Sequence, residues 1–154
     1  ENGKVKINVS INNRPQELLI RIPSWSSMPT LALNSETIHV TKGEYTKLIL
    51  DKKDNIIEIS LNPILKKEEI NGLIAYTYGP IALAIDEESN ENLTLEDLNV
   101  SEISDLKLVE ANNKNAQLIF EAKYNNKIIY FKDYGSAGKR WDSPNNRLTV
   151  WINK

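Results

Sequence analysis

The most constraining feature of this sequence is the alternation of apolar and polar residues with a period of two. Between Lys4 and Ile11, the apolar residues Val5, Ile7 and Val9 alternate with lysine, asparagine and serine. Successive side chains of a strand point to opposite faces, so this pattern predicts a strand with one face in a core and the other in water.

Further short segments are predicted to be strands, each bounded by residues that interrupt pairing. The dipeptides Asn34-Ser35, Asn71-Gly72 and Asn125-Asn126 are expected to form tight turns between neighbouring strands. Segment 93–104 is predicted to be one helical turn or an irregular crossing. The other strands are expected at 18–22, 30–33, 37–40, 45–50, 56–61, 64–70, 73–78, 81–85, 106–110, 117–124, 127–132 and 147–152.

Many short strands at this spacing are typical of sandwiches and barrels. We therefore predict an all-β fold, an antiparallel β-sandwich of jelly-roll-like type. A boundary near Asn62-Pro63 would give units 1–63 and 64–154, either as two small sandwiches or as one compact domain. Strands 73–78 and 81–85 are apolar on both faces and are expected to be among the most buried.

The composition excludes several classes of function. The 154 residues contain no cysteine, which excludes disulfides, thiol catalysis and cysteine-bound zinc. The formal net charge is −2 without a basic cluster, so nucleic acid is not an expected partner. No segment is long and apolar enough to span a bilayer, so no membrane partner is expected. We expect no cofactor and no metal, and the localisation stays open because any signal peptide would lie upstream of Glu1.

The residues suited to catalysis are few. His39 is the only histidine and is interpreted as a strand-face residue. The loop 135–140 resembles a phosphate-binding loop only superficially. Asp133 stands where the first glycine should be, and Arg140 stands where Ser or Thr must reach magnesium. The sequence therefore predicts a loop there and no nucleotide site.

Carboxylates are plentiful, and glycoside hydrolysis needs only two of them. Glu68 and Glu69 are expected on opposite faces of a strand. Segment 86–92 is predicted to be a solvated acidic loop that could hold a cation, yet it lacks the alternating ligands and the glycine of known calcium loops. A complete small hydrolase that uses two carboxylates stays open as a third reading.

Exposed aromatic rings in loops are how many β-sandwiches hold sugars. Trp25 follows Pro23-Ser24, and Tyr134 and Trp141 flank a glycine-bearing loop, with Asp142 as a further hydrogen-bonding group. The alternative interpretation is that these aromatics fold back over the ends of the sandwich as core plugs. Trp151, in the last strand, is interpreted as a packing residue.

Three stretches, in this order, resemble a known family. They resemble the "RIPxW", "YGPLVYALE" and terminal "VWI" signatures of the region C-terminal to the catalytic domain in glycoside hydrolase family 127, the beta-L-arabinofuranosidase-like proteins. The similarity covers almost the whole chain, but Ser35 replaces the usual turn glycine. The stretches are Ile20-Arg21-Ile22-Pro23-Ser24-Trp25, Tyr76-Thr77-Tyr78-Gly79-Pro80-Ile81-Ala82-Leu83-Ala84, and Asp133-Tyr134-Gly135-Ser136-Ala137-Gly138 leading to Trp141-Asp142 and Val150-Trp151-Ile152.

The resemblance implies that the chemistry resides in an upstream helical (α/α)6 barrel, and that this chain is a bacterial, non-catalytic β-sandwich region packed on that barrel. It implies an activity in carbohydrate metabolism for the parent protein and none for the chain alone. The rival interpretation is a carbohydrate-binding module that stacks an oligosaccharide on Trp25, Tyr134 or Trp141. A large exposed apolar patch would favour the supporting role, and a concave strip lined by aromatic residues would favour the module.

Overall fold

The computed structural model describes residues 3–12, 14–91, 93–110, 116–138 and 147–154. The chain divides into two compact units, Glu1–Ile64 (unit 1) and Leu65–Lys154 (unit 2). Every strand pair within a sheet is antiparallel, which confirms the predicted all-β, antiparallel fold class. Among the described residues, no helix is long and apolar enough to cross a membrane.

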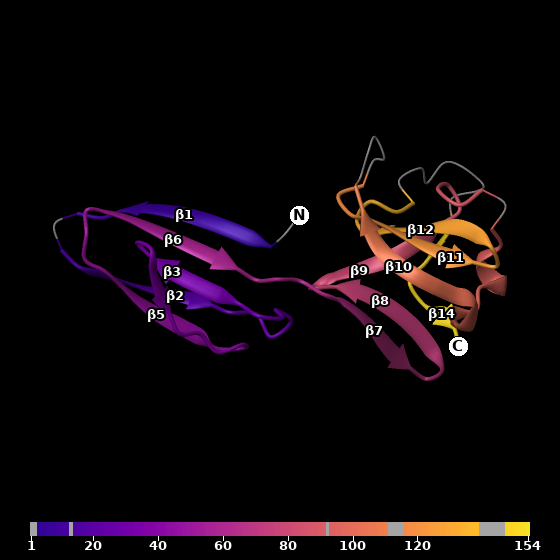
Figure 1. Ribbon diagram of the computed structural model, residues 1–154, viewed down its shortest axis with the longest axis horizontal. Helices are drawn as coiled ribbons and strands as arrows, with labels where there is room; N and C mark the ends of the chain where they lie inside the picture. The colour runs from indigo at the N-terminus through magenta and orange to yellow at the C-terminus, as the bar shows by residue number, and fades with distance from the viewer. Residues whose placement is uncertain (1–2, 13, 92, 111–115, 139–146) are drawn as a thin grey trace. The chain divides into compact units, whose positions relative to one another are not determined.

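Unit 1 is a sandwich of two sheets, drawn from indigo to purple in Figure 1. One sheet has the order β1-β6-β3-β4 and the other pairs β2 with β5. Alternate residues of both sheets face a common core that is centred on Leu31, Leu48, Leu50 and Ile57. The strands are β1 (Lys4–Ser10), β2 (Gln16–Arg21), β3 (Thr30–Leu33), β4 (Glu36–Ile38), β5 (Tyr45–Leu50) and β6 (Asp54–Ser60).

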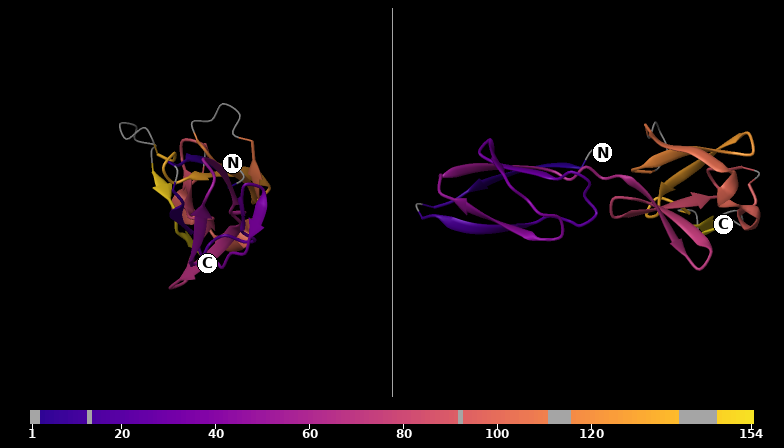
Figure 2. Two further views of the ribbon diagram at one scale, coloured as in Figure 1. Left: turned by 90° about the vertical axis from the view of Figure 1, so that its left-hand side faces the viewer. Right: turned by 60° about the horizontal axis from the view of Figure 1, so that its bottom comes forward.

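Unit 2 is built around one eight-stranded sheet with the main order β10-β11-β12-β9-β8-β14. The sheet curls around its own core, as the right-hand view of Figure 2 shows. Two short 3₁₀ helices, η1 (Leu95–Asp97) and η2 (Val100–Glu102), fill the segment predicted to hold one helical turn. The strands are β7 (Leu65–Ile70), β8 (Leu73–Tyr78), β9 (Ile81–Asp86), β10 (Ile103–Val109), β11 (Ile119–Tyr124), β12 (Lys127–Asp133), β13 (Leu148–Thr149) and β14 (Ile152–Asn153).

Unit 2 contains most of the largest fully buried side chains among the described residues. Phe120 and Phe131 are 2% and 1% exposed, and each meets a tyrosine edge-on. Tyr78 lies against Phe120 and Tyr76 against Phe131, at ring-centroid distances of 5.3 and 5.5 Å. Such edge-to-face pairs stabilise a core beyond simple burial of area.

The three predicted tight turns are confirmed. In Asn34-Ser35, Asn71-Gly72 and Asn125-Asn126 both residues have positive φ values, between 46° and 80°. Two successive residues of this kind define the type I′ turn that suits the twist of a hairpin. Asn tolerates this left-handed backbone better than most residues do, and Gly adopts it without strain.

The hairpin predicted to be the most buried is only partly so. In β9, Leu83, Ala84, Ile85 and Asp86 are all buried, because β9 lies between β12 and β8 in the sheet. Strand β8 buries only Ile74 and Ala75, and its remaining residues are half-buried or exposed. An apolar composition therefore predicted the burial of β9 correctly and overestimated the burial of β8, although β8 also has partners on both edges.

The end of the chain differs from the single predicted strand. It forms two short strands, of which β13 pairs with β9 and β14 pairs with β8. Between them, the Thr149 hydroxyl donates a hydrogen bond to the Trp151 carbonyl at 2.7 Å, within a local turn. Trp151 remains 41% exposed, so its interpretation as a packed residue is only partly right.

Candidate functional site

The four candidate sugar-binding residues belong to different parts of the chain. Trp25 lies in unit 1 and is half-buried after Pro23, whose carbonyl accepts from the Ser26 hydroxyl at 2.6 Å. Tyr134 lies in unit 2 and is 55% exposed, so the plug interpretation is wrong for this residue. Trp141 and Asp142 lie outside the described residues.

Tyr134 projects from a loop that is otherwise firmly anchored. Its backbone N–H donates to the Ala82 carbonyl at 2.9 Å. The Asp133 carbonyl accepts from Ser136 N at 2.9 Å and from Ala137 N at 3.2 Å, which closes a tight turn. An exposed aromatic ring on an ordered loop is available for stacking, because little conformational entropy is lost when it binds.

Asp133 is a structural anchor of this loop. Its side-chain Oδ2 accepts from Gln117 N at 2.9 Å and from Leu118 N at 3.1 Å. The residue is only 7% exposed. The carboxylate therefore holds the segment just before β11 against the end of β12, and its Oδ2 is engaged by two backbone donors.

Asp86 is the centre of a second buried polar group. Its carboxylate lies 3.2 Å from Lys132 Nζ and accepts from Ser89 N at 2.9 Å and Gly138 N at 3.3 Å. Burial alone would raise the pKa of this carboxyl, but the hydrogen bonds from Ser89 and the charge of Lys132 hold the pKa below its ordinary value. Asp86 is thus held as an anion away from water.

Asn90 extends this group towards β12. Its side-chain Nδ2 donates to the Asp86 carbonyl at 2.8 Å and to the Tyr130 carbonyl at 3.0 Å. Its Oδ1 accepts from Tyr130 N at 2.7 Å. The amide thereby pairs with the Tyr130 backbone as a neighbouring strand would, beyond the two residue pairs that join β9 to β12.

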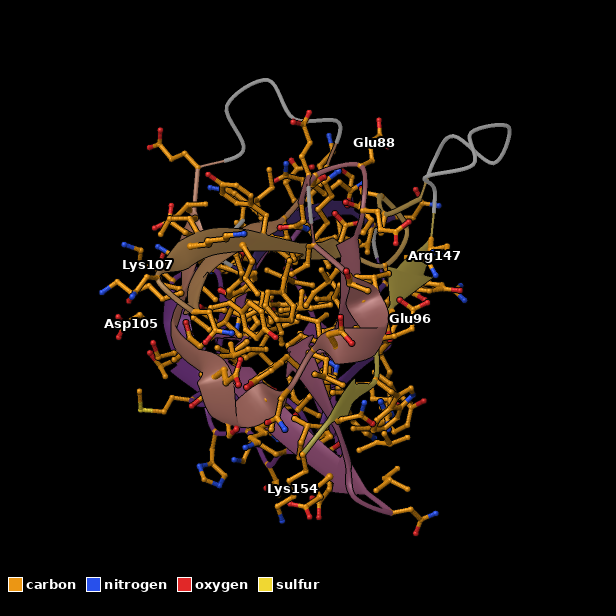
Figure 3. The ribbon with its side chains drawn as sticks, turned by 90° about the vertical axis from the view of Figure 1, so that its right-hand side faces the viewer. Glu88, Glu96, Asp105, Lys107, Arg147 and Lys154 are labelled. Atoms are coloured by element: carbon orange, nitrogen blue, oxygen red, sulfur yellow. The ribbon has the colours of Figure 1, made fainter. Side chains whose placement is uncertain are left out.

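These contacts correct part of the prediction of a solvated acidic loop at 86–92, in which Glu88 and Glu91 are exposed as predicted. Asp86 and Asn90 are 1% and 6% exposed, because partners forty or more positions along the chain enclose them. Glu87 pairs with Arg147 at 2.5 Å, and Arg147 also pairs with Glu96, its neighbour in Figure 3. No group of three metal-ligating side chains occurs in the part of the chain that the structure describes.

His39, predicted to be a strand-face residue, lies one position beyond β4 and is exposed.

The Asn34-Ser35 turn before β4 is held by side-chain hydrogen bonds. Asn34 Oδ1 accepts from Ile56 N at 2.9 Å, and Asn34 Nδ2 donates to Asn55 Oδ1 at 3.1 Å. Asn55 is 1% exposed, so this amide pair fixes the hairpin against β6.

Two hollows lie over sheets. The smaller hollow lies in unit 2 and has a volume of about 360 Å³. Two ion pairs border it, Lys123–Asp105 at 2.7 Å and Lys107–Glu121 at 3.4 Å. Asp105 and Lys107 are labelled in Figure 3. The larger, of about 640 Å³, lies over the four-stranded sheet of unit 1 and is here named the sheet groove. Sequence reasoning missed the sheet groove, since its lining comes from four strands whose register a single sequence does not reveal. No aromatic residue lines it.

Neither a family model nor a curated protein sequence matches this chain. Solved structures do match its fold. A glycoside hydrolase aligns with 99% of the chain at a TM-score of 0.70 and 16% identity. A GH127 beta-L-arabinofuranosidase from Geobacillus stearothermophilus T6 aligns with 99% at 0.68 and 17% identity, and another GH127 beta-arabinofuranosidase aligns with 99% at 0.67 and 16% identity.

The chain spans only 28% to 30% of the length of these three structures. The match therefore defines the chain first as an all-β region of the kind that occurs within larger glycoside hydrolases. More particularly, its fold is the one found in part of the GH127 arabinofuranosidases, as the sequence motifs implied.

Proposed function

We propose that this chain is a non-catalytic β-sandwich region of a larger, bacterial glycoside hydrolase, and that it supports an upstream helical (α/α)6 catalytic barrel. The observation that carries the proposal is the alignment of 99% of the chain with about 30% of glycoside hydrolases that include GH127 arabinofuranosidases. On this proposal the parent protein is beta-L-arabinofuranosidase-like and acts in carbohydrate metabolism.

The engagement of the two buried carboxylates supports a non-catalytic role. A glycosidase needs two carboxyl groups roughly 5 to 10 Å apart that face a substrate. Asp86 and Asp133 instead accept hydrogen bonds from backbone N–H groups, and Asp86 is also paired with Lys132. Both groups use their oxygens to hold β-strands and loops together.

An exposed apolar stripe in unit 1 supports packing against another body. Leu19 on β2 and Tyr45 and Ile49 on β5 are 58%, 64% and 47% exposed. Leu19 is paired with Lys47, so Tyr45 and Ile49 are its diagonal neighbours on the same sheet face. Clustered apolar side chains of this kind mark interaction surfaces more often than scattered ones do.

The test compares the parent protein with a form that lacks this chain, using an aryl arabinofuranoside as substrate. We expect the shortened form to lose thermal stability and activity, and the separately produced chain to restore part of both when added. Replacing Leu19, Tyr45 and Ile49 by serine should weaken that restoration. Serine at the exposed Leu108 and Ile128 of unit 2 is the matched control. Full stability and activity without the chain would contradict the proposal.

A second candidate function, carbohydrate binding, is favoured by the exposed ring of Tyr134. Oligosaccharide binding by the isolated chain that is lost in Tyr134→Ala would support it. The matched control is Tyr45→Ala, which removes a similarly exposed ring from unit 1. If the unsubstituted chain and Tyr134→Ala bind the oligosaccharide equally well, any sugar site lies elsewhere in the chain.

A further inference from the structure

The sheet groove is formed by two rows of side chains on the outer face of the β1-β6-β3-β4 sheet. In one row, Ser60 of β6 lies between Lys4 of β1 and Thr30 of β3. In the other, Glu58 of β6 lies between Lys6 of β1 and Ala32 of β3, and Ala32 is paired with Thr37 of β4. The groove is therefore a surface of the sheet itself, on the most rigid kind of scaffold that this unit offers.

Ala32 creates the hollow. Its methyl group lies in a row between the longer side chains of Glu58 and Thr37, so the row drops to the level of the sheet at this point. The neighbouring Leu31 points the other way and is 1% exposed in the core of unit 1. The floor is thus apolar and firmly supported, while the walls are polar.

The walls carry both donors and acceptors at fixed positions. The Ser60 hydroxyl donates to Asn62 Oδ1 at 3.0 Å, which leaves its lone pairs as acceptors. Glu58 accepts and Lys6 donates, and their charged atoms lie 3.4 Å apart with both side chains more than half exposed. Thr30 and Thr37 add two hydroxyls, and both residues are exposed.

The spacing of these groups suits a chain of sugar rings. Neighbouring strands lie about 4.8 Å apart, and successive residues on one face of a strand are about 7 Å apart. Four strands and two rows therefore give a field of hydrogen-bonding groups about 15 Å by 7 Å, with an apolar methyl in the middle. A sugar offers apolar C–H faces edged by hydroxyl groups, which matches this mixture.

We propose that the sheet groove binds a short, neutral oligosaccharide of two or three units. Glu58 and Lys6 would hold adjacent hydroxyls, and one sugar face would rest on Ala32. The choice of a saccharide rests on the proposed function, whereas the groove does not. The charged residues that line the groove are Lys4, Lys6 and Glu58, so its formal charge is only +1. That charge is too small to hold a polyanion.

The test is a titration of the isotopically labelled chain with arabino-oligosaccharides of two to four units, followed by amide chemical shifts. We expect saturable shifts confined to residues 4–6, 30–32, 37 and 58–60 at millimolar concentration. Glu58→Gln should weaken the affinity about tenfold, because it replaces a charged hydrogen-bond acceptor with a weaker, neutral one. Ala32→Leu should abolish binding by filling the hollow.

The matched control is Glu17→Gln. It removes the carboxylate of another exposed ion pair, Lys47–Glu17 at 2.9 Å, on the other sheet of unit 1, and should leave the affinity unchanged. Glu58 lies on the surface, so Glu58→Gln should keep the amide shift pattern of the folded chain. The test therefore depends on Glu58→Gln and stays decisive even if Ala32→Leu misfolds. Absence of saturable shifts, or shifts that Glu58→Gln leaves intact, would overturn the groove proposal. Either result would leave the supporting role untouched, because that role is measured on the parent enzyme.

Discussion

The ammonium group of Lys132 lies 3.2 Å from the carboxylate of Asp86, and the two side chains are only 9% and 0% exposed. A buried ion pair is costly to form, because both charges leave water, and costly to break, because one charge is then left without its partner. In unit 2 this pair joins the end of β9 to β12, and the same carboxylate accepts a hydrogen bond from the backbone N–H of Gly138.

Removing one partner should therefore destabilise the chain strongly. We expect Lys132→Met to lower the free energy of unfolding by about 3 to 5 kcal/mol, since Asp86 would remain as a buried and unpaired anion. Urea unfolding measures this value. Lys47→Met, which breaks the exposed Lys47–Glu17 pair, should cost no more than about 1 kcal/mol. Equal effects would contradict a buried pair.

The same carboxyl should make stability depend on acidity. The pKa of Asp86 in the folded state lies below its ordinary value. Asp86 therefore contributes stability that is fully present above its pKa in the unfolded chain, which is about 4. That contribution should be lost as the pH falls through the folded pKa. Unfolding free energies measured from neutral to strongly acidic pH test this, with Asp86→Asn as the comparison. A parent chain and variant with parallel profiles below pH ~4 would contradict it.

Asn90→Ala should loosen the junction between β9 and β12. The variant loses three hydrogen bonds that involve the backbone of Asp86 and Tyr130, at a cost of about 3 kcal/mol. Hydrogen exchange at the Tyr130 amide should accelerate as well. Asn8→Ala, at an exposed position in β1, is the control and should change stability little. Unchanged protection of Tyr130 would show that the Asn90 amide is dispensable.

Ser35→Gly should stabilise unit 1. Ser35 has a φ of 71°, a backbone conformation that costs a residue with a Cβ atom about 1 kcal/mol and costs glycine little. The melting temperature should therefore rise, and it can be followed by circular dichroism. A fall would mean that the serine side chain contributes more than its backbone conformation costs.

The local part of the fold could be predicted from the sequence, because alternation and turn residues act over a few positions. The turn at Asn71-Gly72 could be predicted because both residue types adopt a positive φ more readily than other residues do. The burial of Asp86 could not be predicted in this way. Its partner Lys132 is 46 positions away, and a run of acidic residues read alone resembles a solvated loop.

The candidate sites also depend on contacts between residues that are distant in the sequence. The exposure of Tyr134 depends on how its loop closes through Asp133, and composition does not specify that closure. Ala32 is part of a correctly predicted strand, but its role in the sheet groove appears only once its register with Glu58 and Thr37 is known. The candidates Trp141 and Asp142 remain predictions.

The central claim is that this chain contributes support and not chemistry. The most direct measurement is the hydrolysis of p-nitrophenyl arabinofuranosides and other aryl glycosides by the isolated, repurified chain. We predict no turnover above the buffer rate, because Asp86 and Asp133 are held by backbone donors. Turnover that survives repurification and disappears in Asp133→Asn or Asp142→Asn would contradict the account.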